Sequence, residues 1–454
     1  MGRVFTLDRS LEDTLPYLFA LLGIDDPTSS LQQMDPQIRR RRTLESLKRL
    51  FLRESLNQPL ILIFEDLHWI DSETQGFLDV LSEGVASARI LLLVNYRPEY
   101  RQEWGQKTYY TQLRLAPFGQ AEAEEFLAVL LGDEGGATGR SPLHSLKQVI
   151  LDKTEGTPFF MEEIVQEFME QGVLVRNGVG ARLRPSFPTG QVPLPTDLHI
   201  PTTVQGVLAA RIDRLAPDEK ALLQQLAVIG REFPVSLIRQ VITQPEDELY
   251  RLLASLQRKE FLYEQPAFPE VEYLFKHALT QEVAYGTVLQ ERRKSLHEKI
   301  GQAIEALYRV NLEEHYSELA HHYSRSGNAT KAVEYLSLAG QQAARQSANA
   351  DAINHLTTAL ALLKTLPDTT ARARQELTLH LSLGASLMAT KGYTAAEVEH
   401  TYTRAQELCL HLGEPLQVAQ VLYGRWVFYA TRGNHPAALA LGEQFLTVAH
   451  RQQD

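Results

Sequence analysis

The chain has 454 residues, of which 44% are hydrophobic and 22% charged, values typical of a globular protein long enough for about three domains. Its net charge of −11 argues against bulk electrostatic attraction to nucleic acid or to anionic membranes. The single cysteine, Cys409, excludes a disulfide within the chain and a cysteine-based metal site, and no apolar run approaches the roughly 20 residues that span a bilayer. We therefore expect a reducing, cytoplasmic compartment and no membrane segment.

The residues before Pro59 predict two helices, whose apolar stripes cover 11–22 and 44–51. The second stripe follows a basic run, Arg39–Arg42. Such a run can bind phosphate or nucleic acid, or it can be the solvated start of a helix. The acidic balance of the chain favours the second interpretation.

A strand–helix–strand unit is predicted next. Leu60–Phe64 and Arg89–Arg97 are short, continuous apolar runs, a pattern typical of strands buried on both faces of a parallel sheet. Between them, Glu73–Gly84 has helical spacing, with Asp71 or Ser72 as its N-cap. A third short strand is expected at Gln112–Leu115. Helices are expected to follow at 121–131 and 142–152.

Polar side chains follow both predicted strands. Glu65 and Asp66 come directly after the first, and Asn95 and Arg97 end the second. In this position Glu65 would hold Mg²⁺, directly or through water, and Asp66 would orient or deprotonate an attacking water. Asn95 and Arg97 lie where a polar or cationic group could sense a γ-phosphate. A solvated loop after a buried strand is the alternative, because acids are also common helix caps.

Three motifs in order carry a family resemblance: Ile61-Leu-Ile-Phe-Glu-Asp-Leu-His-Trp-Ile-Asp71, Tyr96-Arg-Pro-Glu99 and Gly156-Thr-Pro-Phe-Phe-Met-Glu-Glu163. They resemble the Walker B strand, sensor strand and lid motif of the STAND class of signal-transduction ATPases, which are related to AAA proteins. The most similar type is the bacterial module that often follows a class III adenylate or guanylate cyclase domain. The resemblance implies ATP and Mg²⁺ as ligands, and it implies that Pro158 packs near the adenine.

The phosphate-binding loop of that family is missing. The loop has the pattern Gly-x-x-x-x-Gly-Lys-Ser/Thr, and this chain contains no Gly-Lys pair. We expect that the chain begins inside the ATPase domain, since the downstream motifs keep their residue types. A degenerate pseudo-ATPase that binds no nucleotide is the other option.

The middle of the chain predicts a lid helix and then a winged helix. A helix is expected at Glu162–Gln171, and the Gly- and Pro-rich stretch Arg176–Ile200 reads as a loop and linker. Helices are expected at 202–215, 217–229 and 246–258, and short strands at 261–264 and 272–275. The third helix starts with three acids, which would repel phosphates, so an intramolecular role is favoured over DNA binding. The resemblance makes His277 a candidate contact of the nucleotide, and a purely structural histidine is the alternative.

From about Asn311 the chain predicts only helices, with small residues at fixed offsets. Ala332 and Ala339 are repeated by Ala352 and Ala359, and Gly384 recurs as Gly424. Small residues let paired helices approach closely, as in TPR arrays, and the resemblance supports TPR-like repeats that present a groove to a protein or peptide. We expect the array to continue beyond Asp454. An irregular helical bundle is the alternative.

The predicted fold is therefore α/β followed by all-α: a partial P-loop NTPase parallel sheet with a helical lid, a winged-helix domain and a TPR-like α-solenoid. The predicted domains are 1–118 for the partial ATPase core, 119–190 for the lid, 191–308 for the winged helix and 309–454 for the repeats. The leading hypothesis is a fragment of a signalling ATPase whose switching regulates a linked effector, such as a nucleotide cyclase. A non-enzymatic scaffold and a transcription regulator are the alternatives.

Overall fold

The computed structural model describes residues 9–22, 24, 31, 34–101, 104–132, 142–177, 180–183, 201–267, 270–413 and 415–452. Over these residues the protein is mostly helical, with a small parallel sheet near the N-terminus and stacked helical pairs in the C-terminal half. The chain divides into two compact units, Met1–Gln112 with Tyr308–Asp454, and Leu113–Leu307. Among the described residues, no helix is long and apolar enough to cross a membrane.

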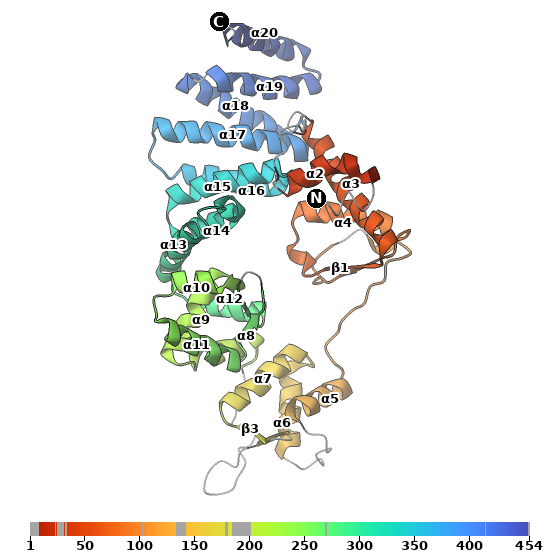
Figure 1. The fold of residues 1–454 in the computed structure, drawn as a ribbon, viewed down its shortest axis with the longest axis vertical. Coiled ribbons are helices and arrows are strands. Elements are labelled where there is room, and N and C mark those ends of the chain that lie inside the picture. The colour runs from red at the N-terminus through yellow and green to blue at the C-terminus, as the bar shows by residue number, and fades with distance from the viewer. Residues whose placement is uncertain are drawn as a thin grey trace. The chain divides into compact units, whose positions relative to one another are not determined.

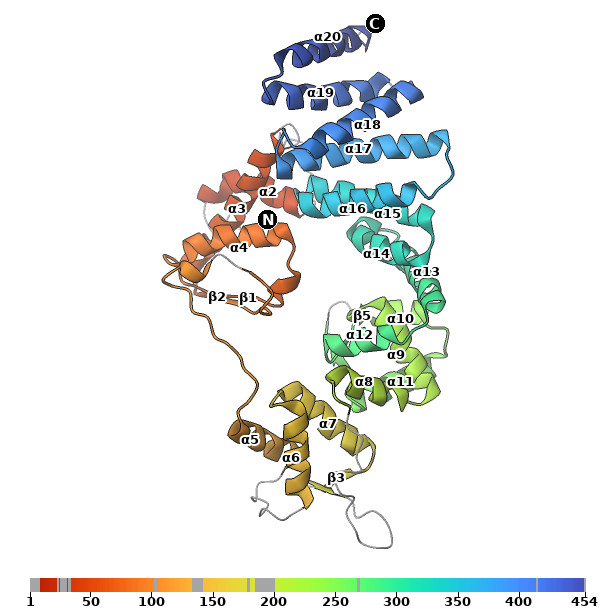
Figure 2. The same cartoon turned by 180° about the vertical axis from the view of Figure 1, so that it is seen from behind.

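The N-terminal part of the first unit has a parallel pair of strands packed under helices. Its elements are η1 (Arg9–Thr14), α2 (Leu15–Leu21), α3 (Pro36–Asn57), β1 (Leu60–Phe64), η3 (Leu67–Trp69), α4 (Ser72–Val85), β2 (Ile90–Val94) and η4 (Trp104–Gln106). β1 and β2 pair in parallel, with Leu60 opposite Ile90 and Phe64 opposite Val94 (Figure 2). α4 begins after Asp71, whose carboxylate accepts from the backbone N–H groups of Glu73 and Thr74, so the predicted cap is confirmed.

Only one face of this sheet is covered by described residues. One face packs on a cluster that includes Phe77, Leu78 and Leu81 of α4. The other face exposes four apolar side chains, whose exposed fractions run from 45% to 64%: Ile61, Ile63, Leu91 and Leu93. The prediction of strands buried on both faces is therefore wrong within the described chain, although parallel sheets are normally covered on both sides.

The predicted third strand is also wrong. Residues 111–119 form no strand, and Leu113 and Leu115 are 83% and 97% exposed. The alternation of apolar and polar residues is correct for a strand, but a strand also needs a partner edge. The described residues supply none here.

The C-terminal part of the first unit is a stack of helices in which neighbours along the chain pack against each other (Figure 1). Its elements are η6 (Leu312–His315), α14 (Tyr316–Ser326), α15 (Ala329–Arg345), α16 (Asn349–Leu363), α17 (Thr370–Lys391), α18 (Ala396–Leu412), α19 (Pro415–Thr431) and α20 (His435–Gln452). The small residues predicted to allow close approach are buried: Ala332, Ala339, Ala352 and Ala359. Gly384 and Gly424 both face the ring of Tyr402, which confirms their role in helix contact.

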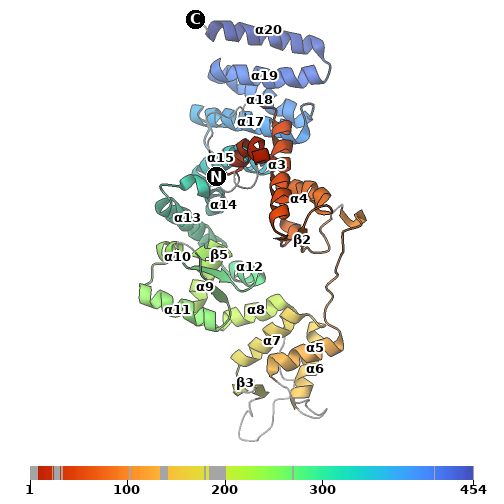
Figure 3. The same cartoon turned by 45° about the vertical axis from the view of Figure 1, so that its right-hand side comes forward.

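The second unit begins with three helices and a hairpin. Its elements are α5 (Gln120–Leu131), α6 (Pro142–Thr154), α7 (Pro158–Glu170), β3 (Leu174–Asn177) and β4 (Gly180–Leu183). The helices share one apolar core, and Figure 3 shows them gathered beside β3. α7 starts four residues earlier than predicted, because Pro158 occupies its first turn, where a missing N–H costs nothing. Most of the predicted linker, residues 184–200, lies outside the described residues.

The rest of the second unit combines helices with a three-stranded antiparallel sheet of order β5-β7-β6. Its elements are α8 (Val204–Asp213), α9 (Pro217–Ile229), β5 (Glu232–Pro234), α10 (Val235–Val241), α11 (Glu246–Arg258), β6 (Leu262–Gln265), β7 (Glu272–Phe275), α12 (Ala278–Gly286) and α13 (Gln290–Leu307). The sequence analysis found α8, α9, α11 and both later strands. It missed β5 and α10, which are too short to show a periodic pattern, and it also gave no bounds for α12 and α13.

Candidate functional site

The turn after β1 holds an unusual backbone. Asp66 is a non-glycine residue with φ 55° and ψ 44°, in the left-handed region. Asn95, at the end of β2, clamps this turn: its side-chain oxygen accepts from the Asp66 N–H at 2.7 Å, and its carbonyl accepts from the Leu67 N–H at 3.0 Å. Strained residues that are held in place by their surroundings cluster at functional sites.

The two predicted acids sit on this turn. Glu65 is exposed and Asp66 is half-buried. No group of three or more His, Cys, Asp or Glu side chains suited to a metal occurs among the described residues. A pair of carboxylates alone fits Mg²⁺ that keeps most of its waters, which is how this ion usually binds to proteins.

Arg97 lies beside the same turn on an aromatic platform. Its guanidinium carbon is 5.7 Å from the centroid of the Trp69 ring, a cation–π arrangement. The His68 ring is 4.9 Å from Trp69, and neither of its nitrogens has a hydrogen-bond partner in the described structure. Sequence reasoning gave Trp69 no role, and it placed Asn95 as a phosphate sensor rather than as the clamp of Asp66. The sequence feature that could have predicted this contact is Asn95 itself, a polar residue at the end of the neighbouring parallel strand.

Pro158 opens α7, and the glycine before it is required by the backbone. Gly156 has φ +76°, and its carbonyl accepts from the Phe118 N–H at 2.8 Å. A Cβ at this position would lie 2.1 Å from the Phe118 carbonyl oxygen, so no other residue fits without movement. At the start of the motif, Gly156 thus lets the backbone lie close to that of Phe118, and Pro158 then begins helix α7.

His277 lies against the same motif. It precedes α12, and its ring centroid is 4.2 Å from that of Phe159, the neighbour of Pro158. Its Nε2 atom is enclosed and has no hydrogen-bond partner among the described residues. Burial, with the charge of Lys276 next in size, lowers the pKa of His277, so the ring is neutral at pH 7.

The candidate residues fall into two sets. Glu65, Asp66 and Arg97 come together in the first unit, and Pro158 and His277 come together, through Phe159, in the second. Each set therefore lies at one place within its own unit.

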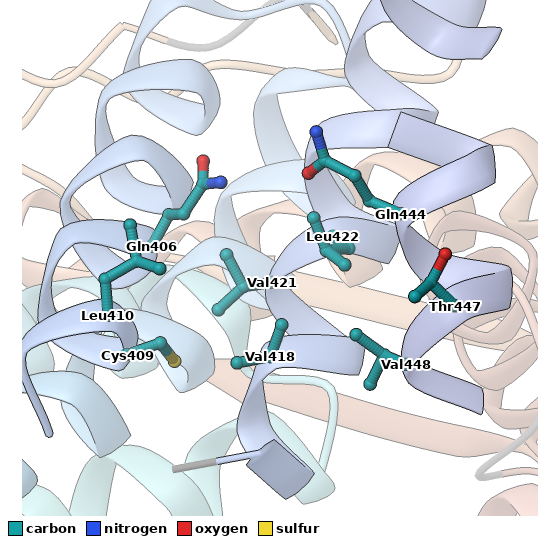
Figure 4. Close-up of a pocket in the computed structure, with 9 residues that line it drawn as sticks. All are labelled: Gln406, Cys409, Leu410, Val418, Val421, Leu422, Gln444, Thr447 and Val448. Carbon is teal, nitrogen blue, oxygen red and sulfur yellow. The ribbon is translucent and has the colours of Figure 1, made fainter. Parts of the chain in front are cut away.

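A separate cavity lies in the stacked helices. It measures about 250 Å³ and is formed by α18, α19 and α20 (Figure 4). Its lining residues are mostly apolar: Gln406, Cys409, Leu410, Val418, Val421, Leu422, Gln444, Thr447 and Val448. Its volume suits one or two side chains rather than a nucleotide, because ligand pockets run from about 300 to 1,000 Å³.

Comparison with known proteins gives a limited result. No protein-family model matches the chain. An uncharacterized protein of Rhizobium meliloti (strain 1021) is 25% identical over 430 residues, which cover 92% of this chain and 39% of that protein. The chain therefore spans well under half the length of this curated relative.

A solved structure is also similar. It is the crystal structure of a Signal Transduction ATPase with Numerous Domains (STAND) protein with a tetratricopeptide repeat sensor, from Pyrococcus horikoshii. The match covers 98% of this chain and 64% of that chain, with 13% identity and a TM-score of 0.39. A likeness at this level assigns neither a family nor a site to the chain.

Proposed function

We propose that this chain is part of a signal-transduction ATPase of the STAND class. In the whole protein, ATP binding and slow hydrolysis would switch the arrangement of its parts and regulate a linked effector, such as a nucleotide cyclase. Residues 1–118 would form part of the ATPase core, 119–190 the lid, 191–308 a winged-helix domain and 309–454 TPR-like repeats that bind a protein or peptide.

One observation carries the proposal: the strained turn that presents Glu65 and Asp66 at the end of a parallel strand. Asp66 adopts a left-handed backbone that costs free energy, and Asn95 from the neighbouring strand stabilises it. The resulting turn places two adjacent carboxylates at the carboxyl end of a parallel strand. Glu65 and Asp66 would hold Mg²⁺ through water, and Arg97 would leave Trp69 to meet the γ-phosphate.

The rest of the ATP site is expected to come from outside these 454 residues. The sequence has no phosphate loop, and the uncovered sheet face formed by Ile61, Ile63, Leu91 and Leu93 is suited to further packing. Pro158 would pack near the adenine, and His277 would contact the nucleotide.

The first test uses this chain alone. We expect no appreciable ATP hydrolysis, because backbone amides and a lysine for the phosphates are missing. Steady-state turnover that Asp66→Asn abolishes would contradict the proposal that the site is incomplete.

The second test adds the upstream coding sequence. Calorimetry with Mg-ATP on the extended protein should show binding that Arg97→Ala weakens by about tenfold to a hundredfold, since a hydrogen bond to a charged group contributes about 1.5–3 kcal/mol. Arg101→Ala, an exposed arginine outside the motif, serves as the matched control.

A non-enzymatic scaffold is the second candidate. The stacked helices and their apolar cavity favour it, since such arrays present surfaces to partners. The absence of Mg-ATP binding by the extended protein would support this candidate. DNA binding is not favoured, because α11 starts with Glu246, Asp247 and Glu248.

A further inference from the structure

Helix α7 presents a row of acids to the 201–307 segment. Glu163, Glu167 and Glu170 are spaced by four and three residues, so they lie on one face of the helix. Two arginines three residues apart lie opposite these acids: Arg211 in the last turn of α8 and Arg214, which directly follows that helix. The two helices are in contact, and the charged rows meet there.

Arg211 is the centre of this seam. Its Nη1 donates to Glu163, and its Nε and Nη2 donate to one carboxylate oxygen of Glu170 at 3.0 and 2.7 Å. The Nη2 atom also donates to the Lys259 carbonyl at 2.8 Å, and the guanidinium lies 4.7 Å from the centroid of the Phe261 ring. All three guanidinium nitrogens are used, which a lysine could not reproduce.

The seam is buried. Arg211 is 2% exposed and Glu163 is 3% exposed, and a second pair joins Arg214 to the buried Glu167. Burial raises the pKa of the Glu163 carboxyl, and the positive charge of Arg211 opposes that rise. A buried ion pair adds little net stability over an apolar pair, but the loss of one partner leaves an uncompensated charge. Each helix therefore depends on the other to keep its charges inside.

The seam includes Glu163, the last residue of the motif that contains Pro158. Glu163 follows Phe159 by four residues, so both side chains lie on the same side of α7. Phe159 packs on His277. Lys276, the residue before His277, forms an ion pair with Glu260. The neighbouring residue Lys259 accepts a hydrogen bond from Arg211 through its carbonyl. A single guanidinium thus connects α7 to the segment Lys259–Phe261, and that segment is in turn paired with Lys276, the residue before His277.

We propose that Arg211 is a positioning residue that, through Glu163 and Glu170, locks α7 onto the 201–307 segment and holds Phe159 against His277. Pro158 and His277 then form one preset face for the nucleotide base and phosphates, a consequence that rests on the proposed function. The lock itself is a property of this chain without any ligand.

The test compares Arg211→Gln with Arg239→Gln in the full 454-residue chain. Arg239 is a half-exposed arginine of α10 that also has an acidic partner, Glu246, and so it is a matched control. The first readout is hydrogen exchange at residues 158–170 and 204–213. The second is the chemical shift of the His277 Cε1–H proton at pH 8. At this pH the His277 ring is neutral, so a change in the chemical shift reports a change in the position of the Phe159 ring relative to His277.

Arg211→Gln should speed exchange in both segments by about tenfold or more, as expected for the loss of a buried charge partner, and it should shift the His277 resonance. Arg239→Gln should change neither. Unchanged exchange and an unchanged resonance in a folded Arg211→Gln protein would overturn the proposal. If that variant does not fold, Glu170→Gln removes only the more exposed partner and should produce the same changes at smaller size, while no change there would equally overturn it.

Neither readout uses nucleotide. Unchanged exchange and an unchanged resonance would contradict the role of Arg211 and would not affect the ATPase proposal. Absence of Mg-ATP binding by the extended protein would contradict the ATPase proposal and would not affect the role of Arg211.

Discussion

At the scale of single residues, the turn after β1 contains a residue with a strained backbone. Asp66 stands in the left-handed region, which costs about 1–2 kcal/mol for a residue with a Cβ. The Asn95 side chain offsets that cost by accepting the Asp66 N–H. Asn95 is therefore a positioning residue for the two acids, and its amide N–H₂ group remains available to a ligand.

Asn95→Ala should loosen this turn. The loss of one hydrogen bond corresponds to about 1 kcal/mol, so exchange of the 65–69 amides should become about fivefold faster. Asn95→Asp keeps an acceptor oxygen at the same place and is the control. Equal exchange rates in the alanine variant and the unmodified protein would show that the turn does not depend on Asn95.

At the scale of elements, the stacked helices are held together by close approach at glycine. A Cβ on Gly384 would lie 2.6 Å, and on Gly424 2.4 Å, from the Tyr402 ring, which is enclosed between α17 and α19. Burial raises the pKa of the Tyr402 hydroxyl, as expected for a phenol removed from water. The two glycines that recur forty residues apart in the sequence, Gly384 and Gly424, thus both pack against the Tyr402 ring.

Gly424→Ala should destabilise this contact. Overpacking a filled core costs about 1–3 kcal/mol, so the thermal midpoint followed by circular dichroism should fall. Gly442→Ala is the matched control, because a Cβ there meets only Trp426, at 3.9 Å, and alanine favours the helix. If both variants melt at the same temperature, the Tyr402 contact is not tight. Tyr402→Leu in the Gly424→Ala background should restore part of the loss.

The same helices should lose stability in mild acid. Burial, before any other cause, lowers the pKa of His380 to about 4. The unfolded chain takes up this proton near pH 6.5, whereas the folded chain does so only near pH 4, so stability falls as the pH drops through that interval. Thermal midpoints measured between pH 7 and 4.5 should fall less steeply in His380→Gln than in His411→Gln, an exposed control on α18. Identical slopes would contradict the pKa assignment.

At the scale of the whole molecule, α3 joins the sheet to the stacked helices within the first unit. Gln37 Nε2 donates to the Met388 carbonyl at 3.3 Å, and Arg39 Nη2 donates to the Ala344 carbonyl at 3.2 Å. These carbonyls lie in the last turns of α17 and α15, where a cation is favourable. Arg40 pairs with Glu73 of α4 at 2.6 Å, so α3 reaches toward the strand-end turn as well.

Removal of both contacts should detach α3 from the stack. In Gln37→Ala with Arg39→Ala, exchange should accelerate about thirtyfold in α3 and at the end of α15, since two hydrogen bonds of about 1 kcal/mol each are lost. Arg41→Ala, on the exposed side of α3, should leave both segments unchanged. If exchange is unchanged in both segments, other contacts hold α3 against the stacked helices.

The sequence alone predicted the elements that have strong periodicity. Leu60–Phe64, Glu246–Arg258 and Glu272–Phe275 occur in the structure at the predicted bounds, because each is a run of side chains with one consistent spacing. The strand-end acids and the N-cap Asp71 were equally visible, since their roles depend on neighbours a few residues away. Local patterns of this kind need no knowledge of distant segments.

Only the tertiary structure decided the remaining features, because each depends on residues that are far apart in the chain. The Gln112–Leu115 alternation forms no strand without a partner edge, and the described residues cover only one face of the sheet although its sequence is apolar on both. The clamp of Asp66 by Asn95 spans 29 residues, and the pairing of Glu163 with Arg211 spans 48. A charge or an amide shows its partner only when the fold brings the two together, as Asn95 does for Asp66 and Arg211 does for Glu163.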